Sequence, residues 1–139
     1  MKQILLILIG LSSLSLAEFT RDGDIVTDSI SKLQWQDNAI GSKMEWQEAI
    51  DYCENTLNLG GYNDWRLPNI NELKSIVDRG RYNPAIVNGF ENTSSDYYWS
   101  STSTKDGSYY AWIVRFGDGY VGYSSKNLNN YVRCVRAGE

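Results

Sequence analysis

Beyond the first 17 residues, the apolar positions of the chain follow three successive patterns. Two short apolar-rich segments, 25–27 and 33–36, are typical of strands. Over residues 46–77, apolar side chains recur every three or four positions, which predicts amphipathic helices. Over residues 97–136, apolar and polar residues alternate, which predicts strands. The order predicts an α+β fold in which two helices form one layer on a twisted antiparallel sheet.

The first predicted helix begins at a capping box formed by Ser42 and Glu45, whose side chains each bond a backbone N–H of the first turn. Gly60-Gly61 ends the helix, since glycine readily adopts the left-handed conformation of a C-cap. The apolar stripe that we expect to be buried comprises Trp46, Ala49, Ile50, Cys53 and Leu57.

The second predicted helix also begins at a capping box, formed by Asn69 and Glu72, and it ends at Gly80. Its buried stripe consists of Ile70, Leu73, Ile76 and Val77. Residues 81–96 contain Pro84, Gly89 and a polar run, which predicts a long irregular loop.

The last third of the chain predicts a sheet of four strands, at 97–103, 109–116, 120–124 and 131–136, with a hairpin turn at 117–119. Alternation in the second strand divides its side chains between two faces. One face carries Tyr110, Trp112, Val114 and Phe116, and the other carries Tyr109, Ala111, Ile113 and Arg115.

The first 17 residues are typical of a secretory signal peptide. A basic start is followed by an apolar run, Ile4 to Leu11, and by small residues that end at Ala17. The run is too short for a membrane span, which needs about 20 apolar residues. We expect the remainder, residues 18–139, to be one domain of about 122 residues in the periplasm or outside the cell.

The charge and the residue types exclude several function classes. The chain has 13 basic and 17 acidic residues and no histidine. Without Lys2 of the leader, 12 basic residues stand against 17 acidic ones, and this acidic balance disfavours nucleic acid as a partner. Histidine is the commonest general base and metal ligand, so its absence disfavours many catalytic and metal sites.

Two cysteines, Cys53 and Cys134, allow either one intramolecular disulfide or two free thiols. Secretion favours the disulfide, which would close a loop of about 80 residues. A reactive thiol would need a neighbouring histidine or a C-x-x-C pair, and the sequence has neither. We therefore expect the cysteines to be structural.

Several ordered motifs together resemble one family. They are Leu33-Gln34-Trp35-Gln36-Asp37, the run from Gly61 to Leu73, Tyr98 to Thr102, Ala111 to Phe116, and Val132 to Arg136. This pattern resembles the DUF1566 family, the C-terminal domain of the Legionella collagen-like adhesin. The resemblance implies a C-type-lectin-like fold, a disulfide between the first helix and the last strand, and attachment to surface glycans, since the adhesin domain binds sulfated polysaccharides. The chain departs from that adhesin in its acidic charge and in lacking a collagen-like array.

The tyrosine-rich last third holds the candidate ligand site, because aromatic faces stack on sugars while amides and hydroxyls bond their polar groups. The alternative is that these tyrosines belong to the core or to cross-strand pairs. The candidate ligand residues are Tyr97, Tyr109, Tyr120, Tyr123, Asn129 and Tyr131. The function predicted from them is a secreted bacterial module that recognises a glycan or a surface protein without catalysis.

Other interpretations stay open beside this one. The tyrosine face could be a subunit interface of an envelope complex, or paired carboxylates could serve a carbohydrate-active enzyme. We expect no cofactor; calcium is disfavoured because the candidate oxygen ligands are scattered along the chain. The five tryptophans are expected in the core. Arg66, Arg133 and Arg136 could bind anions, or Arg66 could instead bond loop carbonyls or Asp64.

Overall fold

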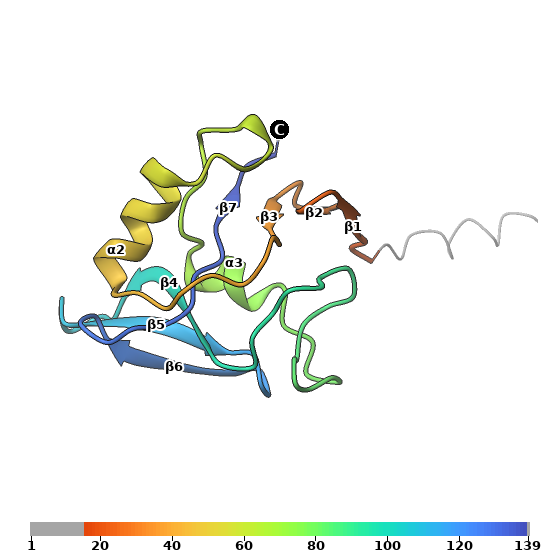
Figure 1. The fold of residues 1–139 in the computed structure, drawn as a ribbon. Helices are drawn as coiled ribbons and strands as arrows, with labels where there is room; N and C mark the ends of the chain where they lie inside the picture. Colours follow the sequence, from red (N-terminus) through yellow and green to blue (C-terminus); the bar gives the residue numbers. More distant parts are fainter. Residues whose placement is uncertain (1–15, 139) are drawn as a thin grey trace, which may run out of the picture.

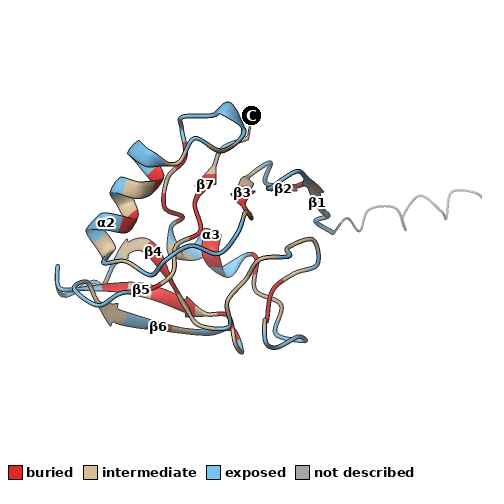
Figure 2. Ribbon diagram, viewed as in Figure 1, coloured by how far each residue is buried: buried red, intermediate tan, exposed pale blue. Residues whose placement is uncertain are grey.

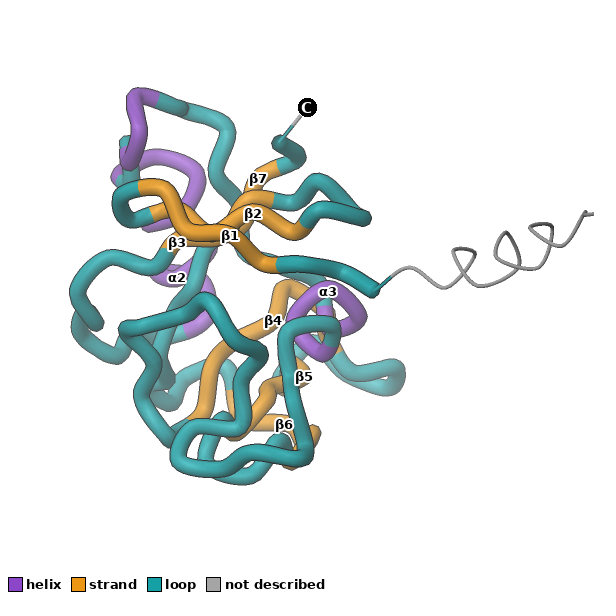
Figure 3. Tube along the Cα trace, turned by 90° about the vertical axis from the view of Figure 1, so that its right-hand side faces the viewer, coloured by secondary structure: helices purple, strands orange, loops and turns teal. Residues whose placement is uncertain are grey.

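The computed structural model describes residues 16–138, so the predicted leader, residues 1–17, lies almost entirely outside the described part. The domain contains two antiparallel sheets at opposite ends (Figures 1 and 3). The four-stranded sheet has the order β1-β2-β3-β7, with β1 Phe19–Asp22, β2 Ile25–Asp28, β3 Gln34–Gln36 and β7 Val135–Arg136. The three-stranded sheet has the order β4-β5-β6, with β4 Tyr97–Ser103, β5 Tyr110–Arg115 and β6 Tyr120–Ser125.

The predicted α+β class is confirmed, but the single sheet is wrong. The expected strand over 131–136 is reduced to β7, which pairs with β3 through Gln34↔Arg136 and Trp35↔Val135. Tyr131 makes only one bridge to β4, opposite Tyr98. The chain then leaves the three-stranded sheet, because the backbone N–H of Cys134 donates a hydrogen bond of 2.8 Å to the side-chain oxygen of Gln36. Cys134 therefore leads into β7, which belongs to the sheet opposite to the one that carries the tyrosines.

Strand β1 was not expected from the sequence. Only Phe19 is apolar in this segment, so alternation gives little signal. The signal present is the turn Gly23-Asp24, with Gly23 at φ 64°, which joins β1 to β2 in a tight hairpin.

Helix α2, Trp46–Asp51, begins later than the capping box predicted at Ser42 and Glu45. Met44 is paired with Asn130 through two backbone hydrogen bonds of 2.9 and 3.0 Å, so the chain before the helix is extended. The box lies one turn further on: the carboxylate of Glu48 accepts a hydrogen bond from the backbone N–H of Glu45 at 3.0 Å. The predicted capping box is therefore wrong in position.

Helix α2 continues as a π-helical segment, η1 (Tyr52–Thr56), and the short 3₁₀ segment η2 (Leu59–Gly61) follows. Gly60 and Gly61 adopt φ values of 70° and 80°, so the glycine pair ends this helical region as predicted. Cys53 lies in η1 and forms the expected disulfide with Cys134, with the two Cα atoms 5.6 Å apart. The disulfide fixes the helical arm to the chain leading into β7.

Helix α3, Ile70–Lys74, has the predicted capping box. The Asn69 side chain accepts from the Glu72 N–H at 2.8 Å, and the Glu72 carboxylate accepts from the Asn69 N–H at 2.9 Å. The helix ends well before Gly80 because Val77 forms a bridge with Ile86 of the following loop. Both helical segments are thus shorter than the apolar pattern predicts.

The core consists of two buried clusters, one on either side of β5. Val114 packs with Leu73, Ile76 and Ile86 in the first cluster. Ile113 packs with Ala49, the disulfide and Trp65 in the second. Figure 2 shows the buried segments on β4, β5 and α3 and on the chain that leads to β7. The irregular loop predicted over 81–96 is confirmed, and its buried residues Ala85 and Ile86 tie it to the core.

Candidate functional site

An open groove of about 850 Å³ lies against β5 and β6 and is called the tyrosine groove here. It lies within the size range of ligand sites, about 300–1,000 Å³. Three of its four tyrosines are exposed, and the fourth, Tyr97, is half-buried. The lining consists of Lys43, Asp96, Tyr97, Tyr110, Ile113, Tyr120, Tyr123, Ser124, Ser125, Leu128, Asn129 and Asn130.

The register of β5 and β6 positions one wall of the tyrosine groove. Arg115 stands opposite Tyr120, and its guanidinium lies 5.0 Å from the Tyr120 ring centre and 5.8 Å from that of Tyr97. The cation therefore lies near two aromatic rings, an arrangement that stabilises both rings in place. Gly122 leaves room for the Tyr120 ring, because a Cβ at position 122 would lie only 2.6 Å from its Cε2 atom.

Arg115 is held in turn by Asp118 of the hairpin turn. The guanidinium donates two hydrogen bonds to the carboxylate, at 3.0 and 2.7 Å. These bonds lower the pKa of Asp118 to about 2 and raise the pKa of Arg115. The pair is consequently ionised at any physiological pH, and the positive charge at this wall is compensated.

The opposite wall comes from segments outside the sheet. Lys43 precedes α2 and lies 3.1 Å from Asp96 in an exposed ion pair. Burial raises the pKa of Asp96, but hydrogen bonds from Lys43 and from the Tyr97 N–H together lower it below its ordinary value. Asn129 and Asn130 follow β6 and add amide groups to this wall. The groove thus combines aromatic rings with amides, hydroxyls and compensated charges.

The six predicted ligand residues separate into two sets. Four of them line the tyrosine groove: Tyr97, Tyr120, Tyr123 and Asn129. Tyr109 is 77 % exposed just before β5 but lies outside the lining. Tyr131 is half-buried against Tyr98, with ring centres 5.5 Å apart, and also lies outside. Their role in binding stays a prediction.

Sequence reasoning missed Tyr110 and Lys43. Alternation placed Tyr110 on the face of Trp112, Val114 and Phe116, and Tyr110 was not among the candidate ligand residues. Val114 and Phe116 are buried, but Tyr110 is 44 % exposed because the core ends before the start of β5. Lys43 carried no signal, since a lone lysine before a helix is ordinarily a solvated charge.

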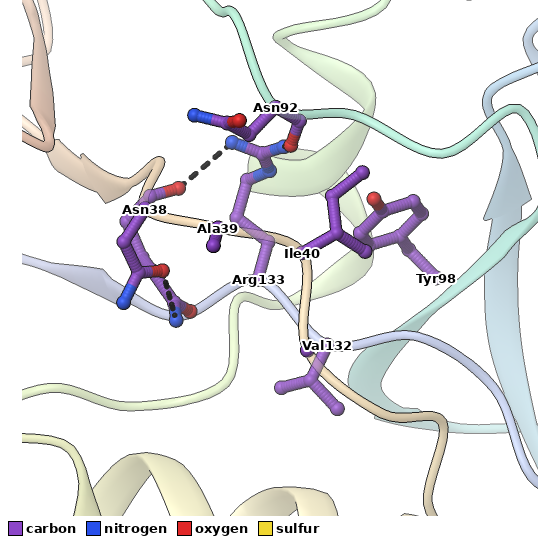
Figure 4. A pocket seen from close by; sticks show the side chains of 9 residues that line it. Asn38, Ala39, Ile40, Asn92, Tyr98, Val132 and Arg133 are labelled. Carbon is purple, nitrogen blue, oxygen red and sulfur yellow. Dashed lines mark hydrogen bonds between the residues drawn. The ribbon is translucent and has the colours of Figure 1, made fainter.

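The arginine motifs of the sequence are structural. Arg133 and Asp37 form a buried ion pair at 2.9 Å, and Arg133 also donates to the carbonyl of Asn92 at 2.7 Å. The cavity beside them has a volume of only about 20 Å³, room for about one water molecule. Figure 4 shows Arg133 extending past Asn38 and Tyr98 toward Asn92. The space holds no ligand-sized site.

The other two arginines are also engaged. Arg66 donates hydrogen bonds from both terminal nitrogens to the Glu72 carboxylate, at 2.8 and 2.9 Å, and not to Asp64, one of the alternatives that the sequence left open. Asp64 instead accepts from Arg136 at 2.7 Å. These pairs occupy the guanidinium groups that the sequence offered as anion sites.

Residues 16–138 were compared with the requirements of a metal-binding cluster and of a membrane-spanning helix. No three acidic, cysteine or histidine side chains in this part of the chain gather closely enough to hold a metal ion. None of its helices has the length and apolar character needed to cross a bilayer.

The family model of the Lcl C-terminal domain, from the Legionella collagen-like protein, matches residues 24–136. The chain belongs to the Lcl C-terminal domain family. The resemblance found in the motifs is thereby confirmed, and the family indicates a bacterial module associated with surfaces and adhesion. No curated protein matches the chain.

The structure gives physical roles to the motifs of this Lcl domain. Trp35 and Trp99 fill the core, and Asp37 and Arg133 form the buried pair. The groove residues Tyr120 and Asn129 lie outside the motifs that carried the resemblance. The motifs therefore supply core and buried polar positions, whereas these two groove residues lie outside them.

Proposed function

We propose that the domain is a recognition module that binds a glycan in the tyrosine groove without catalysis. The observation that carries this proposal is the combination of exposed tyrosine rings with amide and hydroxyl groups in one open groove. Sugars present flat C–H faces and a rim of hydroxyl groups, and a groove of this composition is complementary to both.

Three tyrosine hydroxyl groups of the groove are available to a ligand. Within the described residues, the hydroxyl groups of Tyr110, Tyr120 and Tyr123 have no hydrogen-bond partner in the protein. A sugar hydroxyl can replace the water at each of them without breaking an internal bond. Stacking of a sugar on the tyrosine rings adds apolar contact. The entropic cost is low because a tyrosine side chain has only two rotatable torsions.

Non-catalytic binding agrees with the carboxylates near the groove. Asp96 is the only carboxylate in its lining, and the pKa values of Asp96 and of nearby Asp118 are lowered. A glycosidase needs two carboxyl groups across the scissile bond, one of them with a raised pKa so that it can act as an acid. We therefore propose binding rather than hydrolysis.

The setting that we propose is the bacterial surface. The family and the disulfide between Cys53 and Cys134 fit an extracellular or surface location. The leader-like residues 1–17 support secretion, and the arrangement of short helices, sheets and disulfide supports a C-type-lectin-like architecture. Both are parts of the proposal.

A glycan array probed with residues 18–139 tests the function. We expect the domain to bind a glycan on the array. Tyr120→Ala and Tyr97→Ala should each weaken this binding, while the melting temperature of each variant stays within a few degrees of wild type. Tyr82→Ala is the matched control, because Tyr82 is 77 % exposed and lies outside the groove. Binding should be unchanged by EDTA.

Two outcomes would contradict the proposal. Glycan binding that survives both groove substitutions would place the site elsewhere. Self-association that is lost in the same variants, measured by light scattering, would instead indicate that the tyrosines form a subunit interface.

A further inference from the structure

A second pocket adjoins the tyrosine groove on the far side of Tyr110 and Tyr123. It has a volume of about 400 Å³ and shares these two residues with the groove. Its lining consists of Thr104, Lys105, Asp106, Tyr110, Trp112 and Tyr123. The two hollows therefore meet at this pair of tyrosines.

Three aromatic rings in this pocket form a connected set. Trp112 and Tyr123 are directly opposite in the register of β5 and β6, and Tyr110 lies two residues before Trp112 on the same face. The Tyr123 ring is perpendicular to Trp112, at 90° and 5.8 Å, and nearly so to Tyr110, at 73° and 5.5 Å. Edge-to-face contacts of this kind hold the rings in a defined platform.

Trp112 differs from most other tryptophans of the domain. The indole N–H groups of Trp46, Trp65 and Trp99 each donate to a backbone carbonyl, at 2.9, 3.1 and 2.8 Å. The indole N–H of Trp112 has no partner among the described residues, and the side chain is partly exposed. A partly exposed indole with a free donor can stack on a ligand and bond it at once.

Charge limits which ligand fits the two hollows. The cations at the groove are compensated: Lys43 by Asp96 at 3.1 Å, and Arg115 by Asp118 at 2.7 Å. Lys105 and Asp106 line the second pocket together, so their formal charges cancel. The whole chain carries a net charge of −4. A sulfated chain would meet little uncompensated positive charge here, and the overall field would repel it.

We propose that the ligand is an extended, uncharged glycan chain that occupies the tyrosine groove and continues across Tyr110 and Tyr123 into the second pocket. Trp112 stacks on a sugar there and donates its indole N–H to a hydroxyl or ring oxygen. This inference rests on the proposed function and adds the ligand's length and charge.

Titration calorimetry with neutral oligosaccharides of one to six units tests the inference. The probes are the gluco-, chito- and malto-oligosaccharide series, with heparin as the sulfated comparison. We expect affinity to rise with length in one neutral series and heparin to bind more weakly than its longest member. Trp112→Ala should remove the gain from length, about tenfold.

Control variants separate folding from binding. Trp112→Leu retains apolar volume without an aromatic ring, so it should reproduce the loss even if Trp112→Ala is unstable. Tyr82→Ala should behave as wild type. Tyr123→Ala should weaken both short and long oligomers, because Tyr123 lines both hollows.

The outcomes distinguish this inference from the proposed function. Affinity that is independent of length, or a length gain that survives in both Trp112 variants, overturns the extended site and leaves glycan binding intact. Tighter binding of heparin than of every neutral oligomer overturns the uncharged ligand alone. If neither neutral nor sulfated glycans bind, the proposed function itself is wrong.

Discussion

The carboxylate of Asp37 lies 2.9 Å from the guanidinium of Arg133, and both side chains are buried. Asp37 also accepts hydrogen bonds from the backbone N–H groups of Glu91 and Asn92, at 2.8 and 3.1 Å, and pairs with Arg21. One carboxylate thus joins β1, the end of β3, the long loop and the chain before β7. The four-stranded sheet already connects β1, β3 and β7, and the polar cluster ties the long loop to that sheet.

We expect Asp37→Asn to destabilise the domain by about 3–5 kcal/mol, because the substitution leaves Arg133 buried without its counter-charge. Urea denaturation followed by tryptophan fluorescence measures the change. Asp22→Asn is the control, since Asp22 is exposed in β1, and its effect should stay within about 0.5 kcal/mol. A loss below about 1 kcal/mol for Asp37→Asn would show that the cluster does not hold the segments together.

The disulfide should stabilise the domain independently of the groove. Cys53 and Cys134 are separated by 81 positions, and closing a loop of that length in the unfolded chain corresponds to about 4 kcal/mol. The double variant Cys53→Ala, Cys134→Ala should lose about that much free energy of unfolding. At a temperature where the variant is folded, its glycan affinity should equal that of wild type. A selective loss of affinity would mean that the bridge also shapes the groove.

Acid should weaken the contact between Arg66 and Glu72. The hydrogen bonds from Arg66 lower the pKa of Glu72 below its ordinary value of 4.5. A carboxylate with a lowered pKa stabilises the fold above its unfolded pKa, and this stabilisation is lost as the pH falls through the folded pKa. Between pH 5 and pH 3, wild type should lose about 1 kcal/mol more than Glu72→Gln in chemical denaturation.

The control for this comparison is Glu54→Gln, at an exposed position of η1. Its stability should follow the wild-type pH curve. Parallel curves for wild type and Glu72→Gln would show that the ion pair contributes nothing to folding.

Local chemistry in the sequence predicted the features that depend on nearby residues. The Asn69–Glu72 capping box, the Gly60-Gly61 end and the hairpin at 117–119 all form as expected, since each needs only a few adjacent side chains or a particular φ value. The cysteines were also assigned correctly, because only one intramolecular pairing exists. The tyrosines that line the groove all belong to the last third of the chain, where the sequence places the candidate ligand site.

Long-range pairing could not be predicted in the same way. Alternation over 131–136 gives the same pattern whether the strand joins β4 or β3, and the choice depends on Asp37 and Gln36, about 97 residues earlier. The exposure of Tyr110 likewise depends on where the core ends under β5. Periodicity identifies which side chains share a face but not which part of that face is covered.

Gly122 should be required for the shape of the groove. An added Cβ would lie 2.6 Å from the Tyr120 ring, which is the exposed end of a flexible side chain and can move away. We therefore expect Gly122→Ala to displace the ring and reduce glycan affinity several-fold, with a change in stability below about 1 kcal/mol. Gly107→Ala is the matched control, because its Cβ would contact only a backbone nitrogen at 3.8 Å. Equal affinities for the two variants would show that the position of Tyr120 does not matter for binding.

Binding should be insensitive to pH and to salt over the ordinary range. The chain has no histidine, and Arg115 lowers the pKa of Asp118 to about 2, while the pKa of Asp96 is also lowered. The carboxylates at the groove therefore keep their charge between pH 5 and pH 8, and an uncharged glycan adds no group that titrates. Calorimetry at pH 5, 6.5 and 8 should give dissociation constants within about twofold, and raising NaCl from 50 to 500 mM should change them as little. A tenfold loss of affinity in high salt would indicate that a charged ligand pairs with Lys43 or Arg115, because only such contacts are screened to that extent.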